Sequence, residues 1–267
     1  MICNIQTLQS LTADLRALGV EEGDGLFVHS SMKAIGETVG GPRMVVEALL
    51  SSVGSTGLIG MPGFSTDAYF PANIEPAMLS QAERAMIEDA VPGFDLHRSP
   101  SNEMGVIAET FRTWPGTKRS DHPAVSICLN GLNADGFLAS HPLAWATGRD
   151  SPLGKLMERP SMKILLIGVG WNRCSPLHTA EELAEVRRTK IRRFKHGSAF
   201  GGWMETPDVA DDLNRLFPSV GEAFEETGEV SLGRIGGAPS KLCNYGDLVR
   251  FASAWISRTN AESGDQH

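Results

Sequence analysis

The stretch Lys163-Ile164-Leu165-Leu166-Ile167-Gly168-Val169-Gly170 is a short apolar run that ends in glycines. Such a run is typical of a strand that is buried on both faces of a β-sheet. After a short turn, Ser175-Pro176 is placed to begin a helix, with the serine as its cap and the proline at the first helical position. His178 then lies in the first turn of that helix, just beyond the carboxyl end of the strand. Ligands bind at that edge of open α/β sheets, so we expect a site there.

Three polar side chains recur at a spacing of three residues along this predicted helix: Ser175, His178 and Glu181. They should lie close to one side of the helix. The helix N-terminus favours the neutral imidazole, whereas a nearby carboxylate favours the imidazolium, and a neutral histidine held there could accept a proton. The alternative is structural: Ser175 is only a cap, His178 packs and hydrogen-bonds, and Glu181-Glu182 forms a solvated face.

The chain has 267 residues, of which 41% are hydrophobic, and a formal net charge of −8. It is long enough for one large core and no linker-like stretch divides it, so residues 1–267 are expected to form a single domain. The acidic charge argues against nucleic acid as a partner and is compatible with a cationic ligand. There is no leader-like segment and no apolar run of about 20 residues, which favours a cytoplasmic protein without membrane contact.

The cysteines are far apart in the sequence and form no Cys-x-x-Cys pair; they are Cys3, Cys128, Cys174 and Cys243. Their spacing predicts neither a structural zinc site nor a disulfide framework, and it fits a reducing compartment. No metal is therefore expected.

Apolar periodicity predicts that strands and helices alternate along the chain. We expect an α/β fold with a central mixed β-sheet flanked by helices in a single three-layer domain. Residues 72–101 are largely irregular apart from a short helix over 79–87, and so long a loop is typical of a substrate loop or lid. Residues 190–195 are basic and form either a strand edge or a phosphate contact, and residues 260–267 are expected to form a flexible tail. The other predicted elements are strands over 25–28, 58–62 and up to 129, and helices over 7–18, 42–53, 102–112, from 152, near Asp208 and over 247–257.

Several short motifs occur in one order along almost the whole chain. They include His29-Ser30-Ser31-Met32-Lys33-Ala34-Ile35-Gly36, Arg119-Ser120-x-His122-Pro123-x-x-Ser126, Gly148-x-x-Ser151-Pro152 and Ser175-x-Leu177-His178-x-Ala180-Glu181. Taken together, they resemble the aminoglycoside 3-N-acetyltransferases. This coenzyme A-dependent family is distinct from the common small acetyltransferases, whose Arg/Gln-x-x-Gly-x-Gly/Ala loop is absent here.

The resemblance implies site residues and a co-substrate. The family's catalytic histidine falls on His178 and its preceding hydroxyl residue on Ser175. Its orienting acid falls on Asp208, with Asp211 as the competing alignment and Glu181 as a further candidate. Acetyl-CoA is the implied co-substrate, and its candidate contacts are His29, Ser30, Ser31, Lys33, Gly36, Arg119, Ser120 and Ser126. The candidate contacts of the aminoglycoside are Asp67, Tyr69, Asp95, Glu181 and Asp211.

The implied reaction is transfer of acetyl from acetyl-CoA to the 3-amino group of a 2-deoxystreptamine aminoglycoside, which confers antibiotic resistance. His178 would act as general base for direct attack by the amine, and an acetyl-enzyme on Cys174 is the covalent variant. One alternative is a coenzyme A-dependent enzyme that acetylates a different amine. Another is a metal-dependent amidohydrolase, although no His-Glu-x-x-His spacing supports it. A monomer and a homodimer both remain open.

Overall fold

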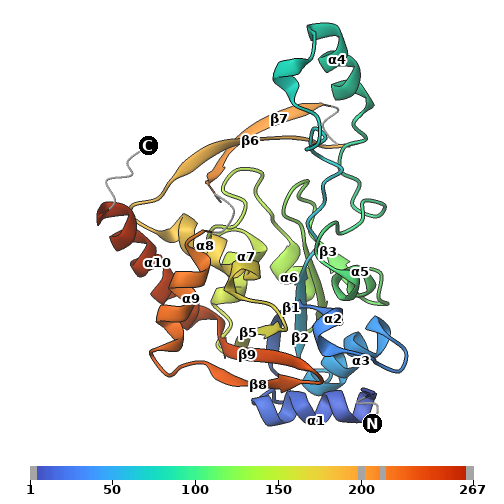
Figure 1. Ribbon diagram of the computed structural model, residues 1–267, viewed down its shortest axis with the longest axis vertical. Coiled ribbons are helices and arrows are strands. Elements are labelled where there is room, and N and C mark those ends of the chain that lie inside the picture. The colour runs from blue at the N-terminus through green and yellow to red at the C-terminus, as the bar shows by residue number, and fades with distance from the viewer. Residues whose placement is uncertain (1–4, 198–201, 211–214, 263–267) are drawn as a thin grey trace.

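A mixed β-sheet forms the centre of the molecule (Figure 1). The computed structural model describes residues 5–197, 202–210 and 215–262. Within them the main sheet has seven strands in the order β3-β4-β2-β1-β5-β9-β8. Strand β1 pairs in parallel with β2 and β5, and the remaining pairs are antiparallel. The strands are β1 (Gly25–Ser30), β2 (Leu58–Pro62), β3 (Lys118–Arg119), β4 (Ile127–Gly131), β5 (Met162–Ile167), β8 (Ser231–Ile235) and β9 (Ala238–Asn244).

Strand β5 is buried on both of its faces, as its apolar run predicts. Ile164 and Leu166 belong to one hydrophobic cluster, whereas Leu165 and Ile167 belong to the other. Alternate side chains of a strand point to opposite faces of the sheet, so this one strand joins both halves of the core. Each fully buried side chain of this kind contributes about 1.5–3 kcal/mol relative to exposure.

Helices cover both faces of the sheet, which confirms the predicted α/β class (Figure 1). Helices α1 (Leu8–Leu18), α3 (Pro42–Val53) and α5 (Val106–Arg112) pack on one face. The opposite face is covered by α6 (Ala134–Leu138), α7 (Pro152–Met157), α8 (Pro176–Leu183), α9 (Phe217–Glu225) and α10 (Tyr245–Glu262). No helix in the described ranges combines the length and the apolar character needed to cross a bilayer.

A two-stranded hairpin stands apart from the main sheet and reaches towards α4 (Gln81–Ala90) (Figure 1). Its strands are β6 (Thr189–Lys195) and β7 (Trp203–Val209). The basic segment over residues 190–195 is therefore part of a strand, which is one of its two predicted alternatives. The predicted helix start near Asp208 is wrong, because Asp208 lies in β7. Burial there alternates with period two, since Thr206 and Asp208 are buried while Glu205 and Pro207 are exposed, and that is the pattern of a strand.

Three boundaries differ from the sequence predictions. Helix α5 begins at Val106 after Gly105, and Asn102 donates its amide to Thr66 Oγ1 instead of capping the helix. Helix α4 runs from residue 81 to 90, because Ser80 and Glu83 form a reciprocal capping box. Helix α10 continues to residue 262, so the first part of the predicted tail is helical and the remainder lies outside the described residues. The short helices are α2 (Met32–Ile35), η1 (Pro76–Met78) and η2 (Trp171–Arg173).

Candidate active site

A cavity of about 1290 Å³ opens where the parallel strands β1, β2 and β5 end. The carboxyl ends of parallel strands meet at the same edge of a sheet, which is where α/β proteins bind ligands. Segments that follow these strands form one side of the cavity, and the β6–β7 hairpin and the end of α4 form the other. The lining includes residues 28–32, 64–67, 69–72, 87, 90–92, 102–105, 169, 172–173, 175, 178, 192 and 208–209.

His178 and Glu181 form a hydrogen-bonded pair beside this cavity. The imidazole Nδ1 lies 2.7 Å from Glu181 Oε2, and the side chains are 13% and 10% exposed. Helix α8 brings them together because residues three apart in a helix are neighbours. Phe217 packs edge-on against the imidazole with ring centroids 4.8 Å apart. The pair is thus held in one geometry, and His178 itself lines the cavity.

The start of α8 is stabilised by a distant histidine. Ser175 is the N-cap residue and Pro176 begins the helix, as predicted, but Ser175 has helical backbone angles and its side chain makes no capping hydrogen bond. Instead, the Ser175 N–H donates to His29 Nε2 at 3.2 Å. Burial, together with the nearby His178, lowers the pKa of His29 to about 3, which keeps it a neutral acceptor. The hydroxyl of Ser175 is consequently not used by the helix, and the residue lines the cavity.

Asp208 is paired with Arg192 rather than with His178. Arg192 Nε donates to Asp208 Oδ2 at 2.6 Å, and Arg192 Nη1 donates to the Tyr69 hydroxyl at 3.1 Å. The other oxygen, Asp208 Oδ1, accepts the N–H of Val209. Of the two candidate acids that the structure describes, Asp208 and Glu181, Glu181 is the one in contact with His178. Asp211 lies outside the described residues.

Glu182 is buried, although the structural alternative places it on a solvated face together with Glu181. Each of the two residues is only 8% exposed. Glu182 Oε2 accepts from the N–H and the hydroxyl of Thr147, both at 3.2 Å, and the hydroxyl is also 3.2 Å from the His178 carbonyl. Burial and then the charge of Asp208 raise the pKa of Glu182 to about 7.

The glycine of the Gly148-x-x-Ser151-Pro152 motif makes room for Glu182. A Cβ atom at Gly148 would lie 1.6 Å from Glu182 Oε1. Further along the motif, Ser151 caps α7 by accepting the Gly154 N–H at 3.2 Å. The motif thus serves both a helix start and the surroundings of the histidine pair, a link that sequence spacing does not reveal.

The polar turn after β1 reaches the cavity in part. Ser30 and Ser31 line it, and Ser31 Oγ also caps α2 by accepting the Ala34 N–H at 3.3 Å. Lys33 and Gly36 are not among the described lining residues. The lining adds residues that the motif comparison missed: Glu103, Met104, Gly105, Asn172 and Arg173.

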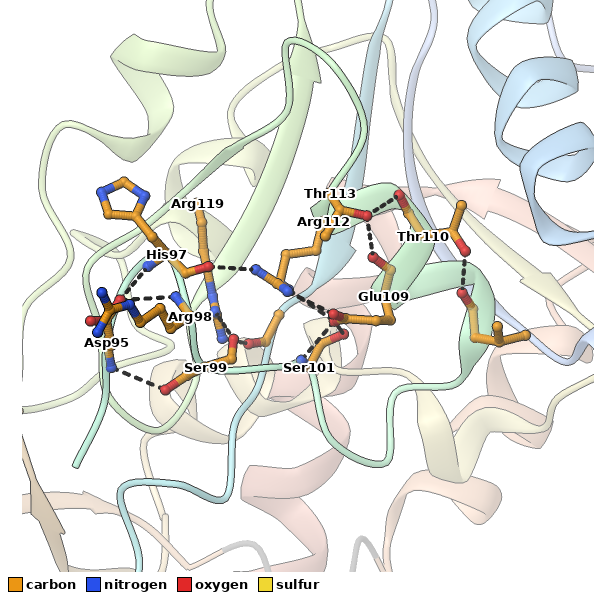
Figure 2. Close-up of polar contacts among 12 residues, drawn as sticks. Asp95, His97, Arg98, Ser99, Ser101, Glu109, Thr110, Arg112, Thr113 and Arg119 are labelled. Carbon is orange, nitrogen blue, oxygen red and sulfur yellow. Dashed lines mark hydrogen bonds and ion pairs between the residues drawn. The ribbon is translucent and has the colours of Figure 1, made fainter. Parts of the chain in front are cut away.

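Arg119, Ser120 and Ser126 hold loops in place and are not among the described lining residues. Arg119 donates to Ser126 Oγ at 2.8 Å and to the carbonyl of Ser99 (Figure 2). Ser126 Oγ donates to the Gly63 carbonyl at 2.6 Å, and Ser120 Oγ accepts the Ile127 N–H at 2.8 Å. Their polar groups are thus engaged within the protein, and our proposal does not use them for coenzyme A.

Among the predicted acceptor contacts, Asp67 and Tyr69 line the cavity. Asp95 is used by its own loop, because its Oδ1 accepts the N–H groups of His97 and Arg98, both at 2.9 Å (Figure 2). These backbone hydrogen bonds lower the pKa of Asp95. Asp95 therefore lies outside the cavity that holds the other two.

Two further histidines lie behind the cavity wall: His122 is fully buried and His141 is partly buried. His122 Nδ1 accepts the N–H groups of Ala124 and Val125, both at 3.1 Å, and these two residues line the cavity. The rings of His122 and His141 lie 4.6 Å apart. Burial, the largest cause in each, lowers both pKa values to about 3. Among the described residues, no group of three or more His, Cys, Asp or Glu side chains is placed to hold a metal ion.

We expect the protein to lose stability on mild acidification, because three of its histidines have lowered pKa values in the folded state. His29, His122 and His141 take up protons near pH 6.5 when unfolded but only near pH 3 when folded. The unfolded state therefore binds more protons between these values, and the free energy of unfolding should fall from pH 7 to pH 5 by at most roughly 1.4 kcal/mol per pH unit for each histidine. Glu182 has the opposite sign, because its folded pKa lies above its unfolded one, and it offsets part of the loss.

Urea unfolding at pH 7 and pH 5 measures this slope. His122→Asn should make it shallower, because one depressed group is removed. His97→Asn, at an exposed histidine, is the matched control and should leave the slope as it is. An equal slope in the wild-type protein and in His122→Asn would show that His122 does not contribute to the acid sensitivity.

The site thus combines a histidine paired with a carboxylate and a cavity of about 1290 Å³ at the ligand-binding edge of a mixed sheet. A family model described as "Aminoglycoside 3-N-acetyltransferase" matches residues 27–257. The chain belongs to this acyltransferase family, which confirms the resemblance seen in the motifs.

The relatives are similar along nearly their whole length. An aminoglycoside N(3′)-acetyltransferase-like protein, YokD of Bacillus subtilis, is 32% identical over 97% of this chain and 95% of its own. The aminoglycoside N(3)-acetyltransferase III of Pseudomonas aeruginosa is 30% identical over 93% of this chain and 92% of its own. A solved structure of AAC-IIIb in a binary complex with coenzyme A superposes with a TM-score of 0.84 at 31% identity, covering 96% of this chain and 97% of the other.

Proposed function

We propose that this protein transfers the acetyl group of acetyl-CoA to the 3-amino group of a 2-deoxystreptamine aminoglycoside, with His178 as the general base. The observation that carries the proposal is the 2.7 Å contact between His178 Nδ1 and Glu181, at the wall of the large cavity. A carboxylate that accepts a hydrogen bond from Nδ1–H selects the neutral tautomer of imidazole whose Nε2 is unprotonated, which is the form that accepts a proton.

The reaction follows from this geometry. The amine attacks the thioester carbon and forms the new C–N bond, while His178 Nε2 takes the amine proton. The C–S bond then breaks, and the proton held by the imidazole can pass to the departing thiolate. Ser175 is the candidate donor to the oxyanion, because its side chain makes no capping bond and the residue lines the cavity.

Direct attack is favoured over an acetyl-enzyme on Cys174. The thiol is fully buried, and burial raises its pKa well above the ordinary value. The reactive species of cysteine is the thiolate. Cys174 is also not among the described residues that line the cavity.

We assign the two ligands to opposite ends of the cavity. Ser30, Ser31, Asn172 and Arg173 lie together around the ends of β1 and β5 and offer hydroxyls, an amide and a positive charge, which suit the phosphates of coenzyme A. The relative with bound coenzyme A supports this co-substrate. Tyr69 and the loop over residues 72–101, with the hairpin, form the acceptor end.

The acceptor assignment is supported by a further relative. AAC-VIa has been solved with bound sisomicin, and it superposes with a TM-score of 0.81 at 29% identity, covering 96% of this chain and 98% of the other. Acetylation of such drugs would confer antibiotic resistance. The family assignment also replaces the amidohydrolase alternative.

The proposal is tested by following thiol release from acetyl-CoA with a panel of aminoglycosides and locating the new acetyl group by mass spectrometry. Acetylation at the 3-amino position is the expected result. If thiol is released only with other amines, the acceptor assignment is wrong but the acyltransferase class stands.

Replacing the orienting carboxylate should slow the chemical step. Glu181→Gln is expected to lower kcat by at least roughly tenfold with little change in KM for acetyl-CoA, because the amide does not fix the Nδ1–H tautomer as a carboxylate does. Steady-state kinetics with both substrates measure this split. Glu185→Gln, at an exposed carboxylate just beyond α8, is the matched control, and an equal kcat in the two variants would argue against an orienting role for Glu181.

A further inference from the structure

The acidic side chains of the loop over residues 72–101 are mostly engaged by the protein itself. Glu83 forms the capping box of α4. Glu88 pairs with Arg193 at 2.9 Å, and Asp95 accepts backbone N–H groups of its own loop (Figure 2). None of these three carboxylates is among the described residues that line the cavity. They are therefore not placed to bind the ammonium groups of an acceptor.

The cavity wall itself carries a nearly balanced set of charges. In the described part of the chain, the carboxylates that line it belong to Asp67, Glu103 and Asp208, and the guanidinium groups to Arg173 and Arg192. Amines of an aminoglycoside are largely protonated near neutral pH. This described part of the wall, with so few excess negative charges, offers weak attraction to a ligand with many ammonium groups.

Of the two described guanidinium groups that line the cavity, Arg192 is the one at the acceptor end. Its guanidinium is 15% exposed and is bonded to Asp208, whose side chain is 2% exposed. It also donates to the hydroxyl of Tyr69. The Arg192 guanidinium thus donates hydrogen bonds to both a carboxylate and a hydroxyl at the acceptor end of the cavity. An acceptor amine would have to compete with it for these two groups.

We infer that Arg192 is a specificity-determining residue that limits how many ammonium groups the acceptor end tolerates, because its positive charge cancels that of Asp208 at the cavity wall. The inference rests on the proposed amine acceptor but not on its being an aminoglycoside. It predicts that acceptors with fewer amines are favoured over close analogues with one more amine near this wall.

Paired drugs that differ by one amine test the inference. Neomycin and paromomycin form one pair, since an amino group of the first is a hydroxyl in the second, and kanamycin B and kanamycin A form another. Arg192→Gln should move the ratio of kcat/KM values towards the amine-bearing member by about threefold to tenfold in at least one pair, as expected for removing one unit charge across a partly solvated cavity. The shift should shrink at high ionic strength.

Three variants separate charge from structure. Arg192→Lys keeps the charge and should keep the wild-type ratio. Arg193→Gln removes the neighbouring charge, which pairs with Glu88 instead of lining the cavity, and should also keep it. In an Asp208→Asn background the shift caused by Arg192→Gln should be smaller, because the carboxylate that it uncovers is gone.

The outcomes are distinct from those of the functional test. If both drug pairs are acetylated and their ratios do not change in Arg192→Gln, Arg192 does not select by charge and the inference is overturned. If no aminoglycoside is acetylated, the acceptor assignment fails. In that case the same ratio, taken from calorimetric Kd values of the drug pairs, still decides whether Arg192 discriminates between them.

Discussion

His178→Ala should lower kcat/KM by about 10² to 10⁴-fold, the usual contribution of a general base to proton transfer. The loss should fall on kcat, because the imidazole acts on the amine proton during attack and contributes little to binding of the coenzyme. Steady-state thiol release measures it, and added imidazole should restore part of the rate to the alanine variant because a small base can enter the space that the ring has left.

His97→Ala is the matched control, since His97 is exposed and is not among the described residues of the cavity wall. It should retain wild-type kinetics. Full turnover by a folded His178→Ala protein would remove the histidine from the mechanism and leave the acyltransferase class in need of a different base.

The second large effect concerns the glycine that ends the central strand. Gly168 has a φ of +65°, and a Cβ atom there would lie 2.3 Å from the Cβ of Ala34 in α2. Gly168→Ala should therefore lower the free energy of unfolding by roughly 2–4 kcal/mol, because the left-handed backbone and the overpacking each contribute. It should also raise KM for acetyl-CoA, because α2 follows the serines that line the cavity.

Gly228→Ala isolates the backbone contribution. Gly228 has a φ of +81° and no atom within 4 Å of an added Cβ. Its replacement should lower the free energy of unfolding by about 1 kcal/mol. Chemical denaturation of both variants gives the difference, and equal losses would mean that α2 moves aside without strain.

Sequence reasoning succeeded where the determining contacts are local. The apolar run of β5 and the three-residue spacing of His178 and Glu181 depend only on strand alternation and helix periodicity. Both features are read directly from neighbouring residues. The strand at Trp203–Val209 is not predicted, because aspartates there are of the kind that the helix dipole favours at a helix start.

Long-range contacts decide the remainder of the site. Ser175 has the residue type of a cap, but its side chain makes no capping bond and its N–H donates to His29 of β1. Asp208 matches the family's acid in its order along the chain, yet its carboxylate is hydrogen-bonded to Arg192 on the paired strand. Glu182 gives no sign of burial in the sequence, because its partner Thr147 comes from a distant loop. Pairings of this kind depend on the tertiary arrangement and not on spacing.

The separation of the hairpin from the main sheet bears on how this enzyme could acquire new substrates. His178, the proposed base, and the residues assigned to the coenzyme sit on segments anchored in the two hydrophobic clusters. Arg192 and Asp208 sit on the β6–β7 hairpin, which adds no strand to the main sheet. Changes in the hairpin would consequently alter which amines enter while leaving the framework for acyl transfer, and most of the folding energy, untouched. Mutations that adapt the enzyme to a new drug should therefore damage folding least when they lie in the hairpin.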